Sequence, residues 1–254
     1  MIILMHSSKT MRAPSTGHRP TGTPVLIDKA RELVDELRAV PAAKLAKIMS
    51  VSPELAEKTR QQYADWNTDT AAQAPAAESF VGDIYSGLQV DSFTAAQRRY
   101  ADAHIRILSG LYGILRPFDG IRPYRLEMGY RLPSGNLYQF WGRAIAEQLP
   151  TRGPIVNLAA AEYSRTVTKF VDPERIVTPK FLTADPKTGE PKFVVVHAKI
   201  ARGAFARWMV TTGAKELREF DDIGYRHEPG LGTEREPAYV CAEFGGKGLS
   251  IRLT

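Results

Sequence analysis

Short apolar runs mixed irregularly with amphipathic helical patterns constrain the fold of this chain more than any other feature. Runs typical of strands lie at residues 2–5, 155–158, 176–182, 192–198 and 238–244. Patterns typical of helices lie at residues 25–39, 53–63, 94–111, 137–149 and 202–212. Strands and helices do not alternate in the regular cadence of a doubly wound sheet. We therefore predict an α+β fold, a single mixed α/β domain spanning residues 1–254, a length that suits one large domain.

Capping residues mark several of the predicted helix ends. Ser52 is followed by Pro53, a combination typical of a helix start. Thr94 and Gln97 have the spacing of a capping box, so we expect a long helix from Thr94 to the first glycine after it. Asn136 is expected to cap the helix at 137–149, and Gly213 is expected to end the helix at 202–212.

No apolar run approaches the roughly 20 residues that a membrane-spanning helix needs. The first residues also lack the basic and apolar segments of a signal peptide. The chain has a single cysteine, Cys241, in an alternating pattern typical of a strand, and we expect a buried, unreactive thiol. These features predict a cytoplasmic protein that does not enter a membrane.

The positive charge of the chain is concentrated in one segment. The formal net charge is +6, and residues 98–131 contain seven arginines against three acidic residues. Arginine suits bidentate contact with phosphate, so a polyanionic partner is one interpretation. The alternative is a solvated face on which each arginine pairs with a nearby carboxylate.

The motif His6-Ser7-Ser8-Lys9-Thr10 directly follows the first predicted strand. Hydroxyl, amide and ammonium donors at the end of a strand can bind an anion, and Arg12 adds a further charge nearby. The motif lacks the glycines of a nucleotide-binding P-loop. It is read either as an anion site or as a plain polar turn.

Gly110 and Gly113 form a Gly-x-x-Gly turn between Arg106 and Arg116. Near residues 96–128 this pattern is similar to a helix-hairpin-helix motif, which binds DNA phosphates through backbone amides. A glycine that ends a helix and is followed by a turn explains the same pattern.

Arginines interleaved with aromatic residues follow this turn, in the segment 122–129 and again near Tyr138. Arg125 can bind phosphate, and neighbouring rings can stack on bases, although packing in the core is the alternative for the aromatic side chains. Glu127 lies among arginines, where it is either an ion-pair partner or a catalytic acid or base.

Two further junctions between a strand and a helix carry charged residues. Glu162 follows the strand at 155–158 and is interpreted either as a catalytic carboxylate or as a charge that stabilises the helix dipole. Lys199 and Arg202 follow the predicted strand at 192–198 and offer another contact for an anion. The five histidines show no spacing typical of metal ligands, so we predict no metal site and no cofactor.

Taken together, these segments resemble the YaaA family of bacterial peroxide-stress proteins. The matching pieces are Ser8-Lys9-Thr10 and residues 82–88, 108–117, 123–129, 137–142, 157–159, 162–163 and 198–203. Two motifs depart from the family pattern. The family's Ser-Pro-Ala-Lys-Thr reads His6-Ser7-Ser8-Lys9-Thr10, and its Glu-Gly-Tyr reads Ile223-Gly224-Tyr225.

The resemblance implies a mixed α/β fold peculiar to the family, a positively charged cleft and helix-hairpin-helix-like DNA binding. It also implies protection against hydrogen peroxide linked to limiting free intracellular iron. The sequence shows no carboxylate and histidine pattern of a ferroxidase, so the peroxide protection is expected to be indirect.

Three functions remain open at this point. The first is a DNA-binding stress protein that contacts the phosphate backbone. Its predicted phosphate-binding residues are Lys9, Thr10, Arg12, Arg106, Gly110, Gly113, Arg116, Arg125, Lys199 and Arg202. The second is an enzyme for a nucleotide, nucleoside or other phosphate-bearing small molecule, with Glu162 or Glu127 as the acid or base. The third is a scaffold whose basic face binds an acidic protein.

Overall fold

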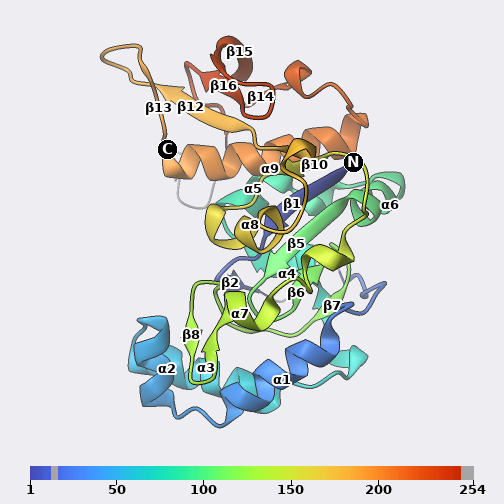
Figure 1. Cartoon of the computed structure of the whole chain (residues 1–254), viewed down its shortest axis with the longest axis vertical. Helices are drawn as coiled ribbons and strands as arrows, with labels where there is room; N and C mark the ends of the chain where they lie inside the picture. Colours follow the sequence, from blue (N-terminus) through green and yellow to red (C-terminus); the bar gives the residue numbers. More distant parts are fainter. Residues whose placement is uncertain (13–16, 247–254) are drawn as a thin grey trace.

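The chain is described here by a computed structural model that covers residues 1–12 and 17–246. Its long axis passes through three regions (Figure 1). A small sheet and a long helix lie at one end, a central sheet lies in the middle, and a group of helices lies at the other end. The prediction of a mixed α+β architecture is confirmed.

The central sheet has the strand order β11-β10-β1-β5-β6. Strands β11, β10, β1 and β5 run parallel, and β6 pairs antiparallel with β5. Their bounds are β1 Ile2–His6, β5 Ile105–Ser109, β6 Gly113–Leu115, β10 Ile155–Asn157 and β11 Ile176–Val177. Strand β1 lies between two parallel neighbours, which explains why Ile3, Leu4 and Met5 are completely buried. The predicted strands at 2–5 and 155–158 are confirmed.

The second sheet has the order β13-β12-β16-β15-β14 and packs against helix α9 (Figure 1). The bounds are β12 Lys180–Ala184, β13 Pro191–Lys192, α9 Val195–Thr212, β14 Asp221–Asp222, β15 Tyr225–Gly232 and β16 Pro237–Cys241. Cys241 is a buried free thiol in β16, as predicted. Gly213 ends α9 in a left-handed conformation with φ 67°, also as predicted.

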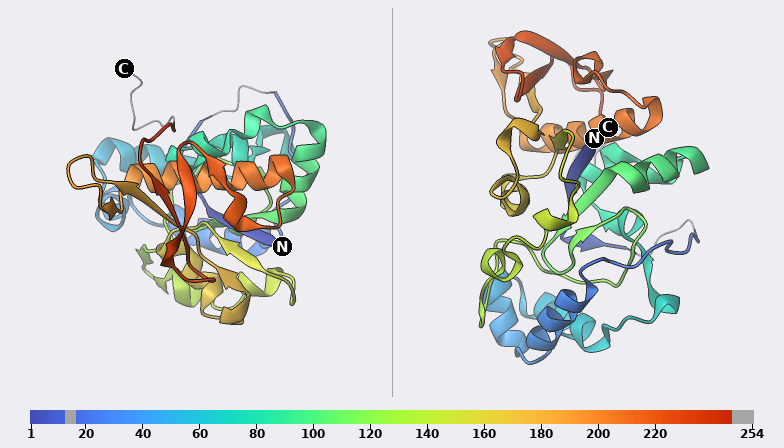
Figure 2. Two further views of the ribbon diagram at one scale, coloured as in Figure 1. Left: turned by 90° about the horizontal axis from the view of Figure 1, so that it is seen from above. Right: turned by 45° about the vertical axis from the view of Figure 1, so that its right-hand side comes forward.

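Helices α1 Ile27–Arg38, α2 Ala42–Met49 and α3 Pro53–Asp65 form the far end of the molecule (Figures 1 and 2). Ser52 caps α3 by accepting a hydrogen bond from the Leu55 amide at 3.3 Å. Nearer the centre are short elements that connect this group to the sheets. They are η1 Thr70–Ala72, β3 Ala74–Pro75, β7 Gly120–Ile121, β8 Arg131–Leu132, β9 Gly135–Asn136 and α7 Leu137–Trp141.

Ten further elements complete the described part of the chain. Their bounds are β2 Thr10–Met11, α4 Ala76–Ser79, β4 Phe80–Val81, α5 Asp83–Leu88, η2 Val90–Ser92, α6 Ala95–His104, η3 Ala146–Gln148, α8 Ala161–Thr168, η4 Pro173–Arg175 and η5 Leu217–Glu219. Helix α8 contacts β1 and β5, and α5 contacts α9. Within the part of the chain that the structure describes, no helix combines the length and apolarity required to cross a bilayer.

Two glycines allow α5 and α9 to cross at backbone contact. A Cβ atom on Gly87 would lie 2.1 Å from the Ile200 carbonyl oxygen, and one on Gly203 would lie 1.9 Å from the Ile84 carbonyl oxygen. No side chain fits at either position without separating the helices. This crossing fixes α9, and with it Lys199 and Arg202, next to the segment that follows β4.

The predicted long helix at 94–111 is wrong in its second half. The capping box of Thr94 and Gln97 is formed, but α6 ends at His104 and residues 105–109 form β5. Apolar residues at 105, 107 and 108 fit either a helix or a buried strand by spacing alone. Residues 105–109 form a strand because their backbone pairs with β1 on one side and with β6 on the other.

The helix-hairpin-helix interpretation of residues 96–128 is therefore also wrong. Gly110 and Gly113 belong to the turn of a β-hairpin, in which Ser109 pairs with Gly113. No helix begins after this turn, since residues 113–115 form β6.

Two other predicted elements differ from the structure. Asn136 caps α7 as predicted, but the helix stops at Trp141 because Gly142 adopts φ 47° and ψ −121°. The predicted strand at 192–198 is mostly the first turn of α9, which begins at Val195. The β-branched pair Val195-Val196 favours a strand locally, and the packing of α9 on α5 overrides that preference.

The glycine crossing leads to a first prediction. We expect Gly87→Ala and Gly203→Ala each to lower the free energy of unfolding by roughly 1–3 kcal/mol or more, because each methyl group meets backbone rather than a movable side chain. Urea denaturation measures the effect. Gly230→Ala is the matched control, since its nearest atom would be 3.6 Å away. Equal stability of all three variants would contradict a backbone contact at the crossing.

Candidate functional site

The largest group of predicted site residues meets in a recess of about 490 Å³ at the carboxyl ends of the central strands. We call it the His6 recess. It is lined by His6, Ser7, Ser8, Lys9, Thr10, Val81, Gly82, Asp83, Ile84, Glu127, Ala160, Glu162, Tyr163 and Lys199. Its volume lies in the range of small-ligand pockets, roughly 300–1,000 Å³.

The parallel strands place these residues at one edge of the sheet. Backbone pairing continues beyond the end of β1, where the Ser7 amide donates to the Leu108 carbonyl at 2.8 Å. The Leu158 amide donates to the Leu4 carbonyl at 2.9 Å, which brings the residues after β10 alongside. Ligands of open α/β sheets commonly bind at such an edge, where neighbouring connections leave in opposite directions.

A second connection brings the start of α5 to the same edge. Strand β2 pairs with β4 through Thr10 and Val81, and the Ser8 hydroxyl donates to the Val81 carbonyl. Asp83 begins α5 directly after this pairing. The end of β1 and the start of α5 thereby form adjoining sides of the recess.

His6 is held in one tautomer at the end of β1. The Ala160 amide donates to Nδ1 of His6 at 3.2 Å, so Nδ1 is an acceptor and the proton of the neutral ring is on Nε2. The ring stacks on Tyr163 with centroids 5.2 Å apart. Burial, followed by the positive charges of Arg202 and Lys199, lowers the pKa of His6 to about 3. His6 therefore presents a neutral N–H donor at physiological pH.

Lys9 and Glu127 form an ion pair in the lining of the recess. Nζ of Lys9 lies 2.7 Å from Oε2 of Glu127, and the Tyr130 hydroxyl donates to Oε1 of Glu127. Burial and this carboxylate raise the pKa of the Tyr130 hydroxyl above its ordinary value. The ion-pair interpretation of Glu127 is confirmed, with Lys9 rather than a neighbouring arginine as its partner.

Glu162 is oriented by the segment that contains Glu127. Its Oε1 accepts a hydrogen bond from the Gly129 amide at 2.8 Å. A Cβ atom on Gly129 would lie 3.1 Å from the same oxygen, so a glycine permits this close approach. Glu162 also lies in the first turn of α8, where its charge favours the helix dipole. Glu162 can therefore stabilise the dipole of α8 and also serve as a carboxylate in the recess.

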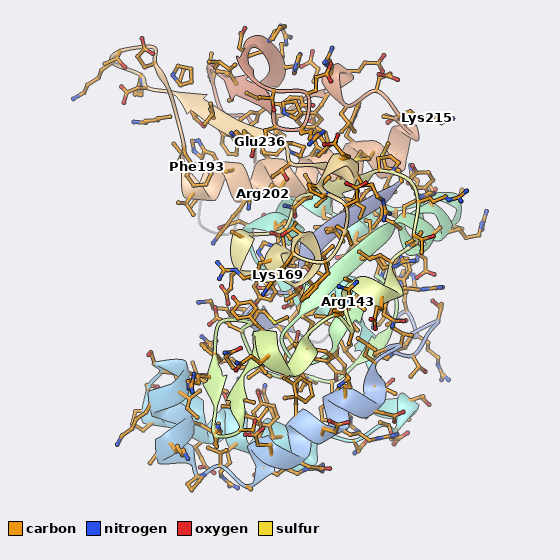
Figure 3. All side chains as sticks on the ribbon, in the orientation of Figure 1. Arg143, Lys169, Phe193, Arg202, Lys215 and Glu236 are labelled. Carbon is orange, nitrogen blue, oxygen red and sulfur yellow. The ribbon has the colours of Figure 1, made fainter. Side chains whose placement is uncertain are left out.

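Lys199 and Arg202, in the first half of α9, have no acidic partner among the residues that the structure describes, whereas Arg207 on the same helix pairs with Asp222 at 2.6 Å. Lys199 lines the recess, and Arg202 lies close enough to lower the pKa of His6 (Figure 3 labels Arg202 on α9). Burial also lowers the pKa of Arg202 itself. Lys199 is exposed and Arg202 is half-buried, so both positive charges are available to a ligand. Ammonium and guanidinium groups of this kind can bind an anion.

Arg125 lies behind Lys9 and supports it. Nη1 of Arg125 donates to the Lys9 carbonyl at 3.4 Å, while Nε is buried without a hydrogen-bond partner. The carbonyl of Arg125 accepts from the Tyr63 hydroxyl at 2.5 Å, which ties this segment to α3. Arg125 is adjacent to the recess but is not among the residues that line it.

Buried tyrosines form a hydrogen-bonded layer beneath the recess. The Ser7 hydroxyl contacts both Tyr124 and Tyr163, and the Tyr124 hydroxyl lies 2.7 Å from the Ser109 hydroxyl. Burial raises the pKa of Tyr124 to about 12, so its hydroxyl keeps its proton. These hydrogen bonds connect the residue that follows β1 to Tyr124 and to Tyr163 on α8.

Arg125 and Arg202 lie next to the recess without lining it, and three other predicted phosphate-binding arginines lie away from it. Arg12 pairs with Asp91 at 3.4 Å and lines a different, smaller pocket. Arg106, near the start of β5, and Arg116, after β6, lie at the opposite edge of the sheet, where they line a shared cavity with Asp102. Arg116 lies 3.6 Å from Asp102, and Arg106 donates to the Asp102 carbonyl at 2.9 Å.

Gly110 and Gly113 are buried and present no amide to a phosphate. A Cβ on Gly110 would lie 2.3 Å from the Leu126 carbonyl oxygen, and the Gly110 carbonyl accepts from Nε1 of Trp141 at 3.0 Å. Gly113 has φ 70° and lies against the Trp141 ring. Their predicted role in binding DNA is wrong, because both glycines serve close packing.

The sequence interpretation overlooked part of the recess. His6 was noted only as part of a motif, and Asp83 and Tyr163 were not singled out for chemistry. The available signal was position, since His6 ends a buried strand and Asp83 begins a helix after Gly82. Ile223, which replaces the family's late acidic residue, does not line the recess.

The described residues contain no group of three or more His, Cys, Asp or Glu placed to hold a metal ion.

Comparison with known proteins identifies relatives along nearly the full chain. The family profile described as "Peroxide stress protein YaaA" matches residues 1–231. A UPF0246 protein of Salinispora tropica is 56% identical, covering 99% of this chain and 98% of the relative. UPF0246 proteins of Burkholderia lata and of a Marinomonas species are 39% and 36% identical and cover 94% and 96% of this chain, each over 98% of its own length.

His6 provides a prediction about pH. We expect the folded protein to keep this ring neutral from pH 5 to 8, whereas the urea-unfolded chain titrates near 6.5. Because only the unfolded state binds the proton between pH 6.5 and about 3, the stabilisation is present above pH 6.5 and is lost as the pH falls. Histidine NMR correlation spectra measure the tautomer and the titration.

The control for this prediction is His6→Asn, whose amide oxygen can still accept from Ala160. The wild type should lose stability more steeply than this variant below pH 6.5, by at most about 1.4 kcal/mol per pH unit. A His6 resonance that titrates near pH 6.5 in the folded protein would contradict the assignment.

Asp119 provides a second prediction about pH, in which the stability of the fold decreases as the pH rises. Burial raises its pKa to about 6, although its Oδ2 accepts from the Arg116 amide at 2.8 Å. The folded state binds the Asp119 proton more tightly than the unfolded state does. The resulting stabilisation is complete below pH 3.8 and is lost as the pH rises through 6. We expect Asp119→Asn to raise the free energy of unfolding by about 1–3 kcal/mol at pH 8 and to have little effect at pH 4. Thermal melting at both pH values measures this difference, and equal destabilisation at both would contradict it.

Proposed function

Because the chain belongs to the peroxide stress protein YaaA family, we propose that it acts in peroxide stress by binding the phosphate of a nucleotide or of DNA in the His6 recess. One observation carries this proposal. Lys199 and Arg202, which have no acidic partner in the described part of the chain, lie beside the neutral N–H of His6 at one edge of the sheet.

These groups come from two distant parts of the sequence. His6 ends β1, Lys9 follows it, and Lys199 and Arg202 lie on α9. Phosphate oxygens accept hydrogen bonds from just this combination of ammonium, guanidinium and N–H donors. The Thr10 hydroxyl also lines the recess and can add a further donor, whereas the Ser7 and Ser8 hydroxyls are already hydrogen-bonded within the protein.

The size of the recess favours a single nucleotide unit as its occupant. A volume of about 490 Å³ suits a mononucleotide. A DNA ligand would therefore place a strand end or an unstacked nucleotide in the recess, as proteins that act on bases do. The recess offers hydrogen-bond donors and positive charges, which suit an anion and not an iron cation. The proposed link between this binding and lower free iron is therefore indirect.

Glu127 and Glu162 allow the recess to be catalytic as well. Both carboxylates line the same cavity as the proposed anion site, and Glu162 is fixed by Gly129. A carboxylate held beside a bound substrate can act as a general acid or base. This favours the enzyme hypothesis over a scaffold for an acidic protein partner.

A second contact with DNA has its own supporting observation. Arg98, Arg99, Arg106 and Arg116 line a cavity of about 490 Å³ at the opposite edge of the sheet, with Asp102 as its acidic residue. We propose that this surface adds contacts to the phosphate backbone of longer DNA. Such contacts weaken with salt and carry no sequence preference.

Variants that remove positive charge from one site at a time distinguish binding in the His6 recess from binding at the cavity lined by Arg106 and Arg116. We expect the double variant Lys199→Ala/Arg202→Ala to bind both mononucleotides and single-stranded DNA more weakly by a factor of roughly 100 or greater, since it removes two charged hydrogen-bond donors that contribute about 1.5–3 kcal/mol each. Arg106→Ala/Arg116→Ala is expected to weaken DNA alone and to reduce its salt dependence. Calorimetry and fluorescence anisotropy measure these affinities.

Lys215→Ala is the matched control, because this exposed lysine lies beyond the far end of α9 (Figure 3). It should bind like the wild type. The proposal fails if the Lys199/Arg202 variant, shown by its melting curve to be folded, retains wild-type affinity for both ligands.

A further inference from the structure

Two parts of the His6 recess differ in charge. The part formed by α9 is cationic, and the part that carries Glu127 and Glu162 also contains Lys9, which pairs with Glu127. Lys199 and Arg202 lie on α9, and Glu127 and Glu162 lie on the segment before β8 and on α8. Lys9 neutralises Glu127, but Glu162 has no cationic partner among the described residues, and its carboxylate would repel a ligand that carried only phosphate. The arrangement requires a ligand with unlike ends.

The carboxylate side is held in place by hydrogen bonds that leave part of it free. Both oxygens of Glu127 are occupied, one by Lys9 and one by Tyr130. Glu162 has its Oε1 on the Gly129 amide, while its Oε2 has no partner among the described residues. Oε2 of Glu162 is therefore a fixed acceptor that lines the recess and awaits a donor.

The middle of the recess does not change charge with pH in the physiological range. His6 is locked by the Ala160 amide and stacked on Tyr163, so it separates the two sides as a neutral group. A ligand that spans the recess meets cations at one end, an N–H donor in the middle and a carboxylate acceptor at the other end.

We propose that the recess is selective for nucleotides whose base carries an exocyclic amino group. This inference rests on the proposed function. The phosphate lies against Lys199 and Arg202, and the amino group of adenine, cytosine or guanine donates to Oε2 of Glu162. Carboxylate side chains accept from such amino groups when proteins read bases.

The same geometry discriminates against bases that present a carbonyl in that place. Uracil and hypoxanthine would direct an oxygen lone pair at the carboxylate, which leaves Glu162 unpaired and adds repulsion. Sites built to accept a particular donor reject ligands that lack it far more strongly than apolar pockets reject a missing methylene.

Matched nucleotide pairs test this selectivity by isothermal titration calorimetry. Adenosine and inosine monophosphate differ at the purine C6 substituent, and cytidine and uridine monophosphate differ at C4. We expect the amino member of each pair to bind at least tenfold more tightly. Inorganic phosphate is the probe for the cationic side alone, and it should bind more weakly than either amino nucleotide.

Variants of the carboxylate side should change the ratio of the two affinities within each nucleotide pair. They should leave the contact with the phosphate unchanged. Glu162→Gln presents an amide that can donate to a carbonyl, so each ratio should fall toward one, while phosphate affinity stays the same or rises. Gly129→Ala keeps the carboxylate but displaces it, because the added Cβ would lie 3.1 Å from Oε1. This second variant should also lower the ratios. Lys199→Ala should weaken every ligand and preserve both ratios.

The outcomes separate this inference from the proposed function. If phosphate and all four nucleotides fail to bind, or if Lys199→Ala changes no affinity, the proposed function is overturned and the selectivity with it. If the nucleotides bind and Lys199→Ala weakens them, but the ratios are near one in the wild type and in Glu162→Gln, only the selectivity is overturned.

Discussion

The backbone contact between α5 and α9 is the constraint on which the rest of the site depends. Gly87 and Gly203 let the two helices approach until carbonyl oxygens of one lie where the other would carry a Cβ. This contact places Lys199 and Arg202 beside the end of β1, although nearly 200 residues of sequence separate them from His6. A wider crossing would move the cations away from the recess without altering a single charged residue.

The chemistry of the recess follows from how its charges are partnered. Glu127 is neutralised by Lys9, and Glu162 is held through one oxygen by Gly129. His6 remains neutral because it is buried beside two cations, and the Ala160 amide determines its tautomer. The result is a preorganised site with donors on one side and an acceptor on the other, so little rearrangement is needed when a ligand binds.

Local charge in the sequence was a poor guide to charge on a surface. The arginine-rich segment at 98–131 does not form one basic face, because β5 and β6 carry Arg106 and Arg116 to the edge of the sheet opposite the recess. Acidic residues within the same segment, such as Asp102, lie next to them. The cations of the recess instead come from remote segments, one or two from each.

Much of the local structure was determined by the sequence itself. The buried strand at 2–5, the caps at Ser52 and Thr94, the start of α7 at Asn136 and the end of α9 at Gly213 all follow from short-range stereochemistry. So does the placement of polar residues directly after strands, which indicated Lys9 and Glu162 as members of a site.

Some sequence patterns fit two different local structures equally well, and only the tertiary structure decided between them. Residues 105–109 became a strand because β1 and β6 pair with them, and Val195-Val196 joined a helix because α9 packs on α5. Gly110 and Gly113 resembled a DNA-binding turn in sequence, but burial against Leu126 and Trp141 makes them packing residues. The sequence determined which groups the chain carries and where single elements begin. Long-range pairing and packing decided which of those groups meet, because neither is encoded within the few residues that a local pattern spans.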